Sequence, residues 1–295
     1  MFTRRQMMFG GAVFTGRIML DPTCVRAQPE VDFQADFAAI EAKTGGRLGV
    51  MLLEHSSGRQ LSYRIDERFP MCSTSKVLVC AAVLARVDRG QESLERQIRF
   101  TPSELTSYSP ATKNHVDSVG MSVASLCQAA ITLSDNTAMN LLIASLGGPA
   151  QVTTFARSIG DSTSRLDRTE PTLNEATPGD PRDTTTPRAM ATSLTELLLG
   201  SALSLGSRRS LAAWMVASTT GSAKLRAGVP PTWQVGDKTG TGDHGTSNDI
   251  AMFWRQHLSP ICAVVYLTGA DSVPEIARAA ASADVGRIAG RAFKS

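Results

Sequence analysis

The run Pro-Ile-Cys-Ala-Val-Val-Tyr-Leu-Thr, residues 260–268, is apolar and rich in β-branched side chains, and it predicts a β-strand. Residues 233–240 and 248–254, shortly before it, carry the same strand signal. Two further strands are predicted near the other end of the chain, at residues 47–54 and 60–64, with a turn between them. The 295-residue chain therefore places strand-forming sequence towards both of its ends.

The sequence between these two strand regions, from about residue 72 to 218, has its apolar residues at helical spacing. Residues 161–183 interrupt that spacing with three prolines and many polar residues, and they predict a long ordered loop. A loop of this length within a compact domain is usually functional or disordered. Terminal helices are predicted at residues 32–43 and 273–292. The helices predicted in the middle are residues 74–88, 121–132, 137–146, 150–159, 187–199 and 207–217.

This order of elements predicts a fold of the α/β plus all-α class. One five-stranded antiparallel sheet would be built from both ends of the chain, with the terminal helices on one face and an inserted all-helical lobe beside the other. A cleft between the lobes is the natural place for a functional site. The predicted segments are 28–66 and 219–295 for the two parts of the α/β lobe and 67–218 for the helical lobe, which includes an omega-type loop at 165–183.

The charge of the chain gives no sign of a nucleic-acid or membrane partner. Its formal net charge is +3, but the first 27 residues hold four arginines and one aspartate, and without them basic and acidic side chains are equal in number. No later apolar run approaches the ~20 residues needed to cross a bilayer. The composition is that of an ordinary globular protein.

Residues 1–27 predict an export signal. The stretch Thr-Arg-Arg-Gln-Met-Met-Phe, residues 3–9, resembles a twin-arginine signal, and Val-Arg-Ala at 25–27 fits a cleavage site after a short apolar run. Because Arg17 interrupts the apolar run, a disordered tail or a misassigned start remains the alternative.

Ser73 and Lys76, in Met-Cys-Ser-Thr-Ser-Lys-Val-Leu-Val-Cys at residues 71–80, form the first candidate for chemistry. Residues three apart share a helical face, so the hydroxyl and the amine can meet, and N–H groups at a helix start can hold an oxyanion. The pair is a weak signal alone, and a capping serine beside a solvated lysine is the favoured explanation until other segments support a site. Three later segments are also ambiguous when each is taken alone. In the order in which they are named next, a helix cap, an edge strand protected by lysine and a solvated loop would explain them. These segments are Ser134-Asp135-Asn136, Lys238-Thr239-Gly240-Thr241-Gly242 and Glu170-Pro171-Thr172-Leu173-Asn174.

The three later segments carry complementary chemistry. Ser134 has a hydroxyl that can relay a proton, and Asn136 has a carboxamide that can orient a substrate amide. Lys238, with hydroxyls and glycines after it, can bind a carboxylate while the backbone approaches closely. Glu170 can act as a general base that positions a water molecule, with Asn174 as the second anchor of that water.

Together and in this order, the four segments resemble those of class A serine β-lactamases. The resemblance covers essentially the whole chain after residue 30. It implies the fold predicted above and hydrolysis of the β-lactam amide bond of penicillins and cephalosporins through a serine acyl-enzyme, which confers β-lactam resistance. With the predicted signal, we expect an exported, periplasmic, monomeric enzyme that acts on a small molecule without a cofactor, nucleic acid or membrane. No metal ion is expected, since the four histidines form no ligand cluster.

The resemblance also implies a role for each residue. Ser73 would be the nucleophile, its backbone N–H and that of Thr241 would form the oxyanion hole, and Ser134 would pass a proton to the leaving nitrogen. Lys76 and Glu170 remain alternatives as the base in acylation, and Glu170 would be the base in deacylation. The implied catalytic residues are Ser73, Lys76, Ser134 and Glu170, and the implied substrate-binding residues are Tyr108, Asn136, Asn174, Lys238, Thr239, Gly240 and Thr241.

Four residues have structural roles by the same resemblance. Arg168 and Asp183 match an ion pair that closes the long loop. Cys80 and Cys127 match a disulfide that would join the helix after Ser73 to the helix that leads to the Ser-Asp-Asn segment.

Two further features bear on the substrates that the site accepts. Cys72 matches a cysteine that is bridged in some carbapenem-hydrolysing members, but Gly242 stands at the partner position, so no such bridge is expected. Lys224 stands where some members carry a cation that supports carboxylate binding, although an exposed loop lysine is an equal alternative. With Thr219 and Thr220 it forms a second-line candidate.

Two other classes of protein share part of this pattern. A D,D-peptidase uses the same catalytic serine, lysine and Lys-Thr-Gly motif, but it stays acylated by penicillin. A β-lactam sensor is acylated without turnover and usually carries a membrane anchor. Glu170 and Asn174 favour the lactamase, because deacylation requires them.

Overall fold

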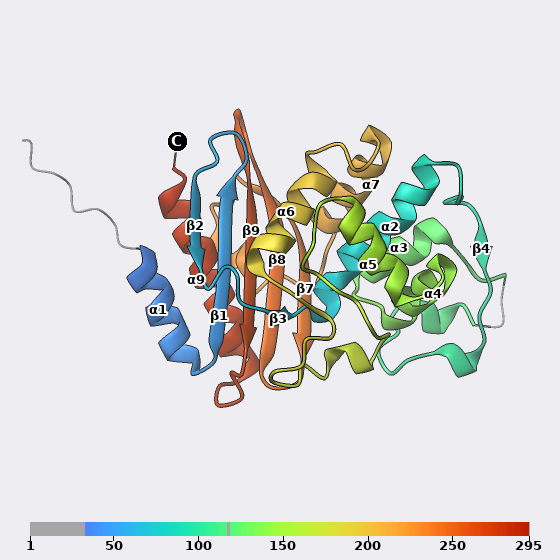
Figure 1. Ribbon diagram of the computed structural model, residues 1–295, viewed down its shortest axis with the longest axis horizontal. Helices are drawn as coiled ribbons and strands as arrows, with labels where there is room; N and C mark the ends of the chain where they lie inside the picture. Colours follow the sequence, from blue (N-terminus) through green and yellow to red (C-terminus); the bar gives the residue numbers. More distant parts are fainter. Residues whose placement is uncertain (1–32, 117–118, 295) are drawn as a thin grey trace, which may run out of the picture. The chain divides into compact units, whose positions relative to one another are not determined.

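A computed structural model of the protein describes residues 33–116 and 119–294, and the predicted signal at residues 1–27 lies outside these ranges. Within them, the main sheet is five-stranded and antiparallel, in the order β2-β1-β9-β8-β7 (Figure 1). The prediction of one sheet built from both ends of the chain is therefore confirmed. The strands are β1 (Arg47–Glu54), β2 (Gln60–Tyr63), β7 (Gln234–Gly242), β8 (Thr246–Arg255) and β9 (Leu258–Thr268).

Strand β9 lies in the middle of the sheet and explains its apolar sequence. It pairs with β1 on one side, where Val50 faces Val265, and with β8 on the other, where Ile250 faces Val264. Residues 261–267 are buried, because helices cover both faces of the sheet. A continuous apolar strand is the sequence that such a doubly covered position requires.

The first face of the sheet is covered by the terminal helices α1 (Phe33–Thr44) and α9 (Glu275–Ala292), as Figure 1 shows. Their apolar side chains, such as Phe37 and Ile288, form one core with the strands beneath them. The short helix α8 (Leu225–Gly228) contributes Leu225 to the same core.

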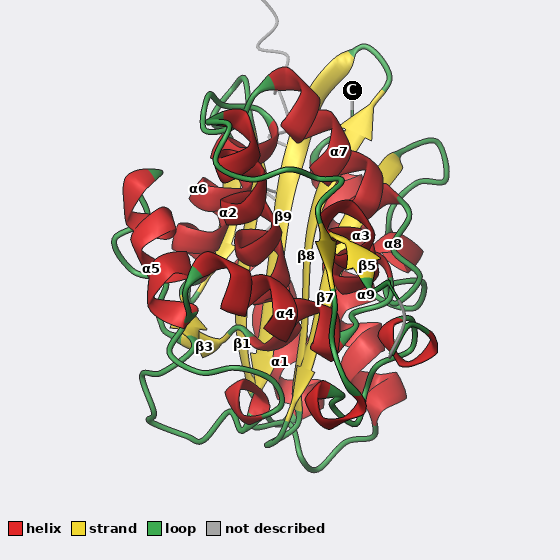
Figure 2. Ribbon diagram, turned by 90° about the vertical axis from the view of Figure 1, so that its right-hand side faces the viewer, coloured by secondary structure: helices red, strands yellow, loops and turns green. Residues whose placement is uncertain are grey.

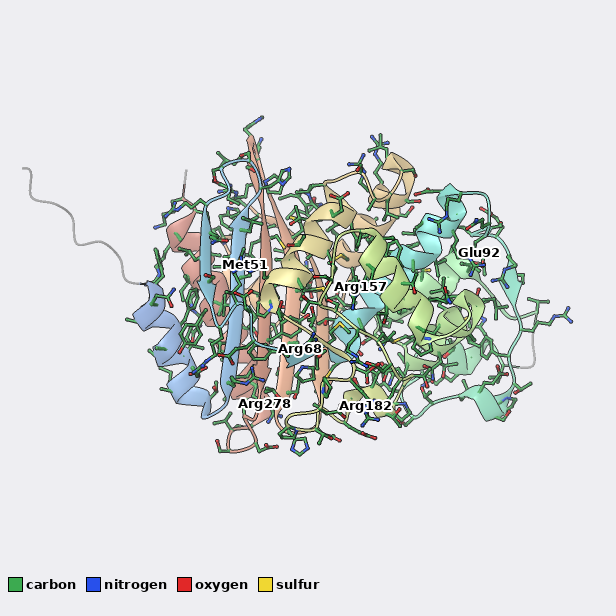
Figure 3. All side chains as sticks on the ribbon, viewed as in Figure 1. Met51, Arg68, Glu92, Arg157, Arg182 and Arg278 are labelled. Atoms are coloured by element: carbon green, nitrogen blue, oxygen red, sulfur yellow. The ribbon has the colours of Figure 1, made fainter. Side chains whose placement is uncertain are left out.

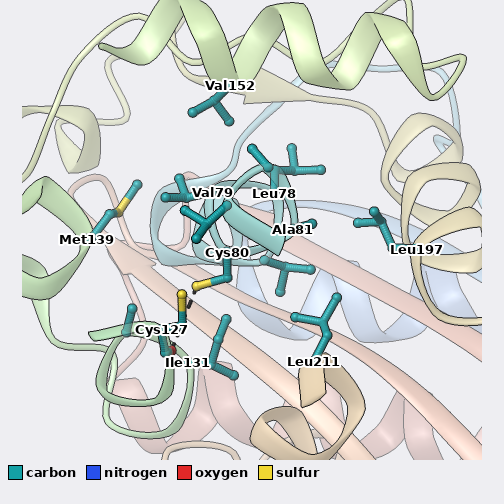
Figure 4. Close-up of a cluster of buried hydrophobic side chains, with 14 of the residues drawn as sticks. Leu78, Val79, Cys80, Ala81, Cys127, Ile131, Met139, Val152, Leu197 and Leu211 are labelled. Carbon is teal, nitrogen blue, oxygen red and sulfur yellow. Dashed lines mark hydrogen bonds between the residues drawn. The ribbon is translucent and has the colours of Figure 1, made fainter. Parts of the chain in front are cut away.

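The helical lobe packs against the opposite face (Figure 2) and is built around helix α2 (Lys76–Asp88). Residues 76–85 of α2 are all buried, because the helix is apolar on every side and other helices surround it (Figure 4). No helix among the described residues is long and apolar enough to cross a membrane. The other helices of this part of the chain are α3 (Val123–Thr132), α4 (Asn136–Leu146), α5 (Pro149–Ser158), α6 (Pro187–Leu198) and α7 (Leu205–Val216).

The structure corrects two predicted helix starts. Residues Cys72–Ser75 form the 3₁₀ helix η1, and α2 begins only at Lys76. The predicted helix at 121–132 opens with the short strand β5 (Met121–Ser122), which pairs with β4 (Gln97–Ile98). Such two-residue strands show no alternation, so sequence periodicity cannot reveal them. The remaining short elements are β3 (Phe69–Pro70), β6 (Thr184–Thr185), and the 3₁₀ helices η2 (Pro102–Glu104), η3 (Thr112–Asn114) and η4 (Thr172–Asn174).

Cys80 and Cys127 meet at the contact between α2 and α3, where Figure 4 shows their sulfur atoms side by side. Both are buried free thiols, and Cys80 Sγ lies 3.8 Å from the carbonyl oxygen of Cys127. The structure thus contains the predicted neighbours but not the predicted bond. Packing of α2 against α3 brings the two thiols together. Whether they form a disulfide bond depends on the redox conditions of the compartment.

Candidate active site

Ser73 and Lys76 lie at the junction of η1 and α2, at the centre of a buried hydrogen-bond network. Lys76 Nζ donates to Ser73 Oγ at 2.6 Å, to Asn136 Oδ1 at 2.8 Å and to Glu170 Oε1 at 2.5 Å. Lys76 is fully buried and Ser73 is 8% exposed, so the serine is the member of this pair that an incoming molecule can reach. Four residues from three separate sequence segments thus come together as predicted.

The backbone conformation of residues 71–75 positions Ser73 beside Lys76. Cys72 has a left-handed backbone with a φ of 47°, and its carbonyl accepts a hydrogen bond from Ser75 Oγ at 2.7 Å. Thr74 Oγ1 donates to the Met71 carbonyl at 2.8 Å and lies 3.1 Å from the hydroxyl of Tyr266 on β9. These bonds fix η1 against the sheet.

The electrostatics of Lys76 follow from its burial. Loss of hydration lowers the pKa of Lys76 below the ordinary lysine value, and the nearby Glu170 carboxylate opposes that change only in part. A lysine with a lowered pKa has a larger neutral fraction, and only the neutral amine can accept a proton.

Glu170 is held in the site by contacts on both its backbone and its side chain. The Glu170 N–H donates to Asn140 Oδ1 at 2.9 Å, and Asn140 Nδ2 donates to the Glu170 carbonyl at 2.9 Å. Asn174 Nδ2 donates to Glu170 Oε2, while Asn174 Oδ1 is buried and has no hydrogen-bond partner among the described residues. That oxygen is available to accept a hydrogen bond from a water molecule.

The predicted brace of the loop is present. Arg168 Nε donates to Asp183 Oδ2 at 2.6 Å, and Asp183 Oδ1 accepts the backbone N–H groups of Asp167 at 2.7 Å and of Arg168 at 3.0 Å. The Asp183 carbonyl also accepts the N–H of Met71 at 2.9 Å, two residues before Ser73. The brace therefore joins the loop to the segment of the nucleophile.

Ser134 and Lys238 form a second pair beside the first. Lys238 Nζ donates to Ser134 Oγ at 3.0 Å and to the Thr239 carbonyl at 2.8 Å. Burial, reinforced by the positive charge of Lys76, lowers the pKa of Lys238 to about 7. Ser134 has a left-handed backbone with a φ of 59°, and the next residue, Asp135, caps α4 by accepting the N–H of Ala138.

Strand β7 approaches η1 closely, and this approach requires Gly240. A Cβ atom at this position would lie 2.9 Å from the Met71 carbonyl oxygen and 3.2 Å from Thr74 Cγ2. Thr239 Oγ1 lies 2.7 Å from Thr220 Oγ1, and Thr241 is exposed at the end of β7.

Tyr108 is half exposed, and its carbonyl accepts the N–H of Asn136 at 3.0 Å, so it lies beside the predicted binding residues. Thr219 Oγ1 donates to the Thr132 carbonyl at 3.1 Å. The alternative of an exposed lysine at Lys224 is wrong, because this side chain is buried and donates to Ser247 Oγ at 2.9 Å.

Gly242 lies directly against Cys72, as the family resemblance implied. A Cβ atom at Gly242 would lie 2.6 Å from Cys72 Sγ and 2.6 Å from the Asn174 carbonyl oxygen. Because glycine has no thiol, Cys72 has no bridging partner there, and it is described as a buried free cysteine.

Sequence reasoning missed Asn140 and Asn248. Asn140 stands one helical turn after Asn136 on α4, which is a spacing that could have indicated a shared face. Asn248 Nδ2 donates to the carbonyls of Pro70 at 2.9 Å and Met71 at 3.2 Å, and nothing in the sequence indicates this contact.

A serine hydroxyl that is hydrogen-bonded to a buried amine is an arrangement found in enzymes that use the serine as a nucleophile. Residues 32–293 match the model of the β-lactamase enzyme family. The chain is 52% identical over 247 residues to β-lactamase CTX-M-8 of Citrobacter amalonaticus, which covers 84% of each chain. It is 53% identical over 235 residues, or 80% of each chain, to β-lactamase Toho-1 of Escherichia coli.

Solved structures agree with the sequence relatives. An ancestral class A β-lactamase (GNCA) superimposes with a TM-score of 0.86 at 58% identity, covering 88% of this chain and 99% of that one. The chain belongs to the β-lactamase enzyme family, as a class A serine β-lactamase. The family match favours the lactamase over the D,D-peptidase and the sensor.

Proposed function

We propose that this class A β-lactamase hydrolyses penicillins and cephalosporins through an acyl-enzyme on Ser73. The main support for the proposal is the buried network in which Lys76 Nζ donates hydrogen bonds to both Ser73 Oγ and Glu170 Oε1. The network gives the nucleophile a base within hydrogen-bond distance, which is the first geometric requirement of such a reaction.

In acylation, Ser73 Oγ attacks the β-lactam carbonyl carbon and the bond from that carbon to the ring nitrogen breaks. The hydroxyl proton passes to Lys76 when the amine is neutral, or to Glu170 through a water molecule. The lowered pKa of Lys76 supports the first route, and the carboxylate of Glu170 supports the second. Backbone N–H groups of Ser73 and Thr241 hold the oxyanion, and Ser134 passes a proton to the ring nitrogen.

In deacylation, a water molecule between Glu170 and Asn174 attacks the acyl carbonyl, and Glu170 accepts the proton of that water. Asn174 Oδ1 supports this role, because it is buried and available as an acceptor. The bond from the acyl carbon to Ser73 Oγ then breaks, and the proton that Glu170 accepted returns to Ser73 Oγ by way of Lys76, which contacts both groups.

The substrate is oriented by its two polar ends. Lys238, Thr239 and Thr241 bind the carboxylate beside the fused ring, and Gly240 lets β7 run close to Ser73. Asn136 and Tyr108 flank the amide side chain.

Turnover of nitrocefin and benzylpenicillin tests this proposal. The wild-type protein should hydrolyse many equivalents, and Glu170→Ala should be acylated once and then retain the acyl group in intact-mass spectra. The matched control is Glu95→Ala, which removes an exposed carboxylate that contacts the Ser93 hydroxyl and lies outside the site, and it should keep turnover. Stoichiometric trapping by the wild-type protein would contradict the proposal.

We propose in addition that residues 1–27 direct export to the periplasm and are removed, that the mature enzyme acts as a monomer, and that Cys80 and Cys127 become a disulfide there. N-terminal sequencing of the exported product tests the signal, with Arg4 and Arg5 changed to lysine as the export-deficient variant. Gel filtration tests the monomer. Intact mass without reductant tests the bond, which would lower the mass by about 2 Da by loss of two hydrogens.

A further inference from the structure

A cavity of about 480 Å3 lies beside the long loop and contains none of the proposed catalytic or substrate-binding residues. Its walls come from residues 45–47, where β1 begins, from Arg68 and Pro70 before η1, and from the loop at residues 176–182. Leu173 also reaches this space. We call this space the loop cavity.

Basic side chains dominate the charge of the loop cavity. Four arginines line it, and Asp180 is its only acidic lining residue. Asp180 is already held by Arg182, whose Nη2 lies 2.6 Å from Asp180 Oδ2. Arg168 is neutralised by Asp183 and Glu175.

Arg68 is the cation that these ion pairs leave unneutralised. Its Nη1 donates to the Thr163 carbonyl at 3.1 Å and to Thr184 Oγ1 at 3.0 Å, and both acceptors are uncharged. In the described part of the chain no carboxylate lies within ion-pair distance of Arg68. Neighbouring Arg47 shares Glu67 with another arginine, so it adds positive charge to the same wall.

The two uncharged contacts hold the Arg68 side chain in place. A guanidinium held in this way is pre-organised, so less rotamer entropy is lost when it forms further hydrogen bonds. Figure 3 labels Arg68 and Arg182, which come from separate segments of the chain. The space between such groups favours an anion that can accept several N–H bonds at once.

We propose that the loop cavity is a binding site for a compact organic polyanion bearing carboxylate or phosphate groups, with Arg68 as its principal contact. The volume is within the range of small-molecule sites, roughly 300–1,000 Å3, and exceeds what a single inorganic oxyanion fills. Pro70, Leu173 and Pro178 give the cavity apolar wall, which suits the carbon skeleton of such a ligand.

Occupation of the site would connect two parts of the fold. Arg68 precedes β3, whereas Arg182 and residues 176–181 belong to the loop that carries Glu170. An anion held between them would slow the opening of the loop, and hydrogen exchange can measure that effect without reference to hydrolysis.

Calorimetric titration of the purified protein with citrate, at constant ionic strength balanced with sodium chloride, tests the proposal. Citrate should bind saturably at one site, and inorganic phosphate should bind more weakly. Arg68→Gln should weaken citrate binding at least about tenfold, because it removes a charge-assisted contact. Arg68→Lys should retain part of the affinity, and Arg209→Gln, which alters an exposed arginine on α7, should bind as the wild type does.

Hydrogen exchange locates the bound anion. Citrate should slow exchange at residues 176–182 in the wild type and not in Arg68→Gln. The proposal is overturned if no saturable binding occurs at constant ionic strength, or if Arg68→Gln binds citrate as tightly as the wild type. It is equally overturned if protection appears on β7 and affinity falls in Lys238→Gln instead, because citrate then occupies the active site.

Discussion

Replacement of Asp183 with asparagine tests whether the brace holds Glu170 in register. Asparagine keeps the shape and one oxygen, which can still accept the N–H groups of Asp167 and Arg168. The asparagine NH2 group, however, would replace Asp183 Oδ2, which now accepts a hydrogen bond from Arg168 Nε. Two donors would then face each other, and no hydrogen bond could form. The structure therefore predicts the loss of one charge-assisted bond at a site where Asp183 is 1% exposed.

The magnitude follows from that single bond. Loss of a buried hydrogen bond between two charged groups costs roughly 2–3 kcal/mol, and Arg168 keeps its ion pair with Glu175. At 1.4 kcal/mol for each factor of ten, displacement of Glu170 would slow deacylation by at most about 30- to 150-fold. Acylation should change less, because Ser73 and Lys76 lie on η1 and α2 and not on the loop.

Stopped-flow kinetics and time-resolved intact-mass spectra separate the two steps. Asp183→Asn should accumulate acyl-enzyme with benzylpenicillin, whereas Asp180→Asn, in the partly exposed pair with Arg182 in the same loop, should keep the deacylation rate within about twofold. An unchanged deacylation rate in Asp183→Asn would refute the reasoning. So would an equal loss of both rates that tracks a lower unfolding temperature, because the change would then act through global stability.

Three further predictions concern other residues of the active site and its surroundings. Because the pKa of Lys238 is lowered to about 7, its ammonium is lost as the pH rises through that value, so kcat/KM for carboxylate-bearing substrates should fall above about pH 7. This alkaline limb should disappear in Lys238→Arg, whose guanidinium stays charged. Gly242→Ala places a Cβ atom 2.6 Å from the Asn174 carbonyl oxygen, so thermal unfolding should occur at a lower temperature and deacylation should slow. Asn140→Ala removes both hydrogen bonds to the Glu170 backbone, and pre-steady-state kinetics should show slower deacylation with acylation less affected.

The sequence was most informative where periodicity or composition was strong. The apolar run of β9 and the all-round apolar α2 were predicted because burial on every side leaves a continuous signal. The start of α2 was wrong, since residues 72–75 form a 3₁₀ turn set by a left-handed Cys72 that no local pattern marks. The four motif segments were predicted as one site only through the family resemblance. Contacts such as that of Asn248 with the Pro70 carbonyl depend on pairing across 178 residues, which periodicity cannot encode.

The backbone around the site shows that the motif residues reach their positions only in the folded chain. Cys72, Ser134 and Asp183 all have left-handed backbones, with φ of 47°, 59° and 56°. Such conformations cost on the order of 1–3 kcal/mol each and persist only where the surrounding structure enforces them. Cys72 is held through the Ser75 hydroxyl and Asp183 through the N–H of Met71, so two of these three residues are fixed by contacts within the segment of the nucleophile or between it and the brace. The Asp183 contact also ties the loop that carries Glu170 to the segment before Ser73, so its loss should slow deacylation.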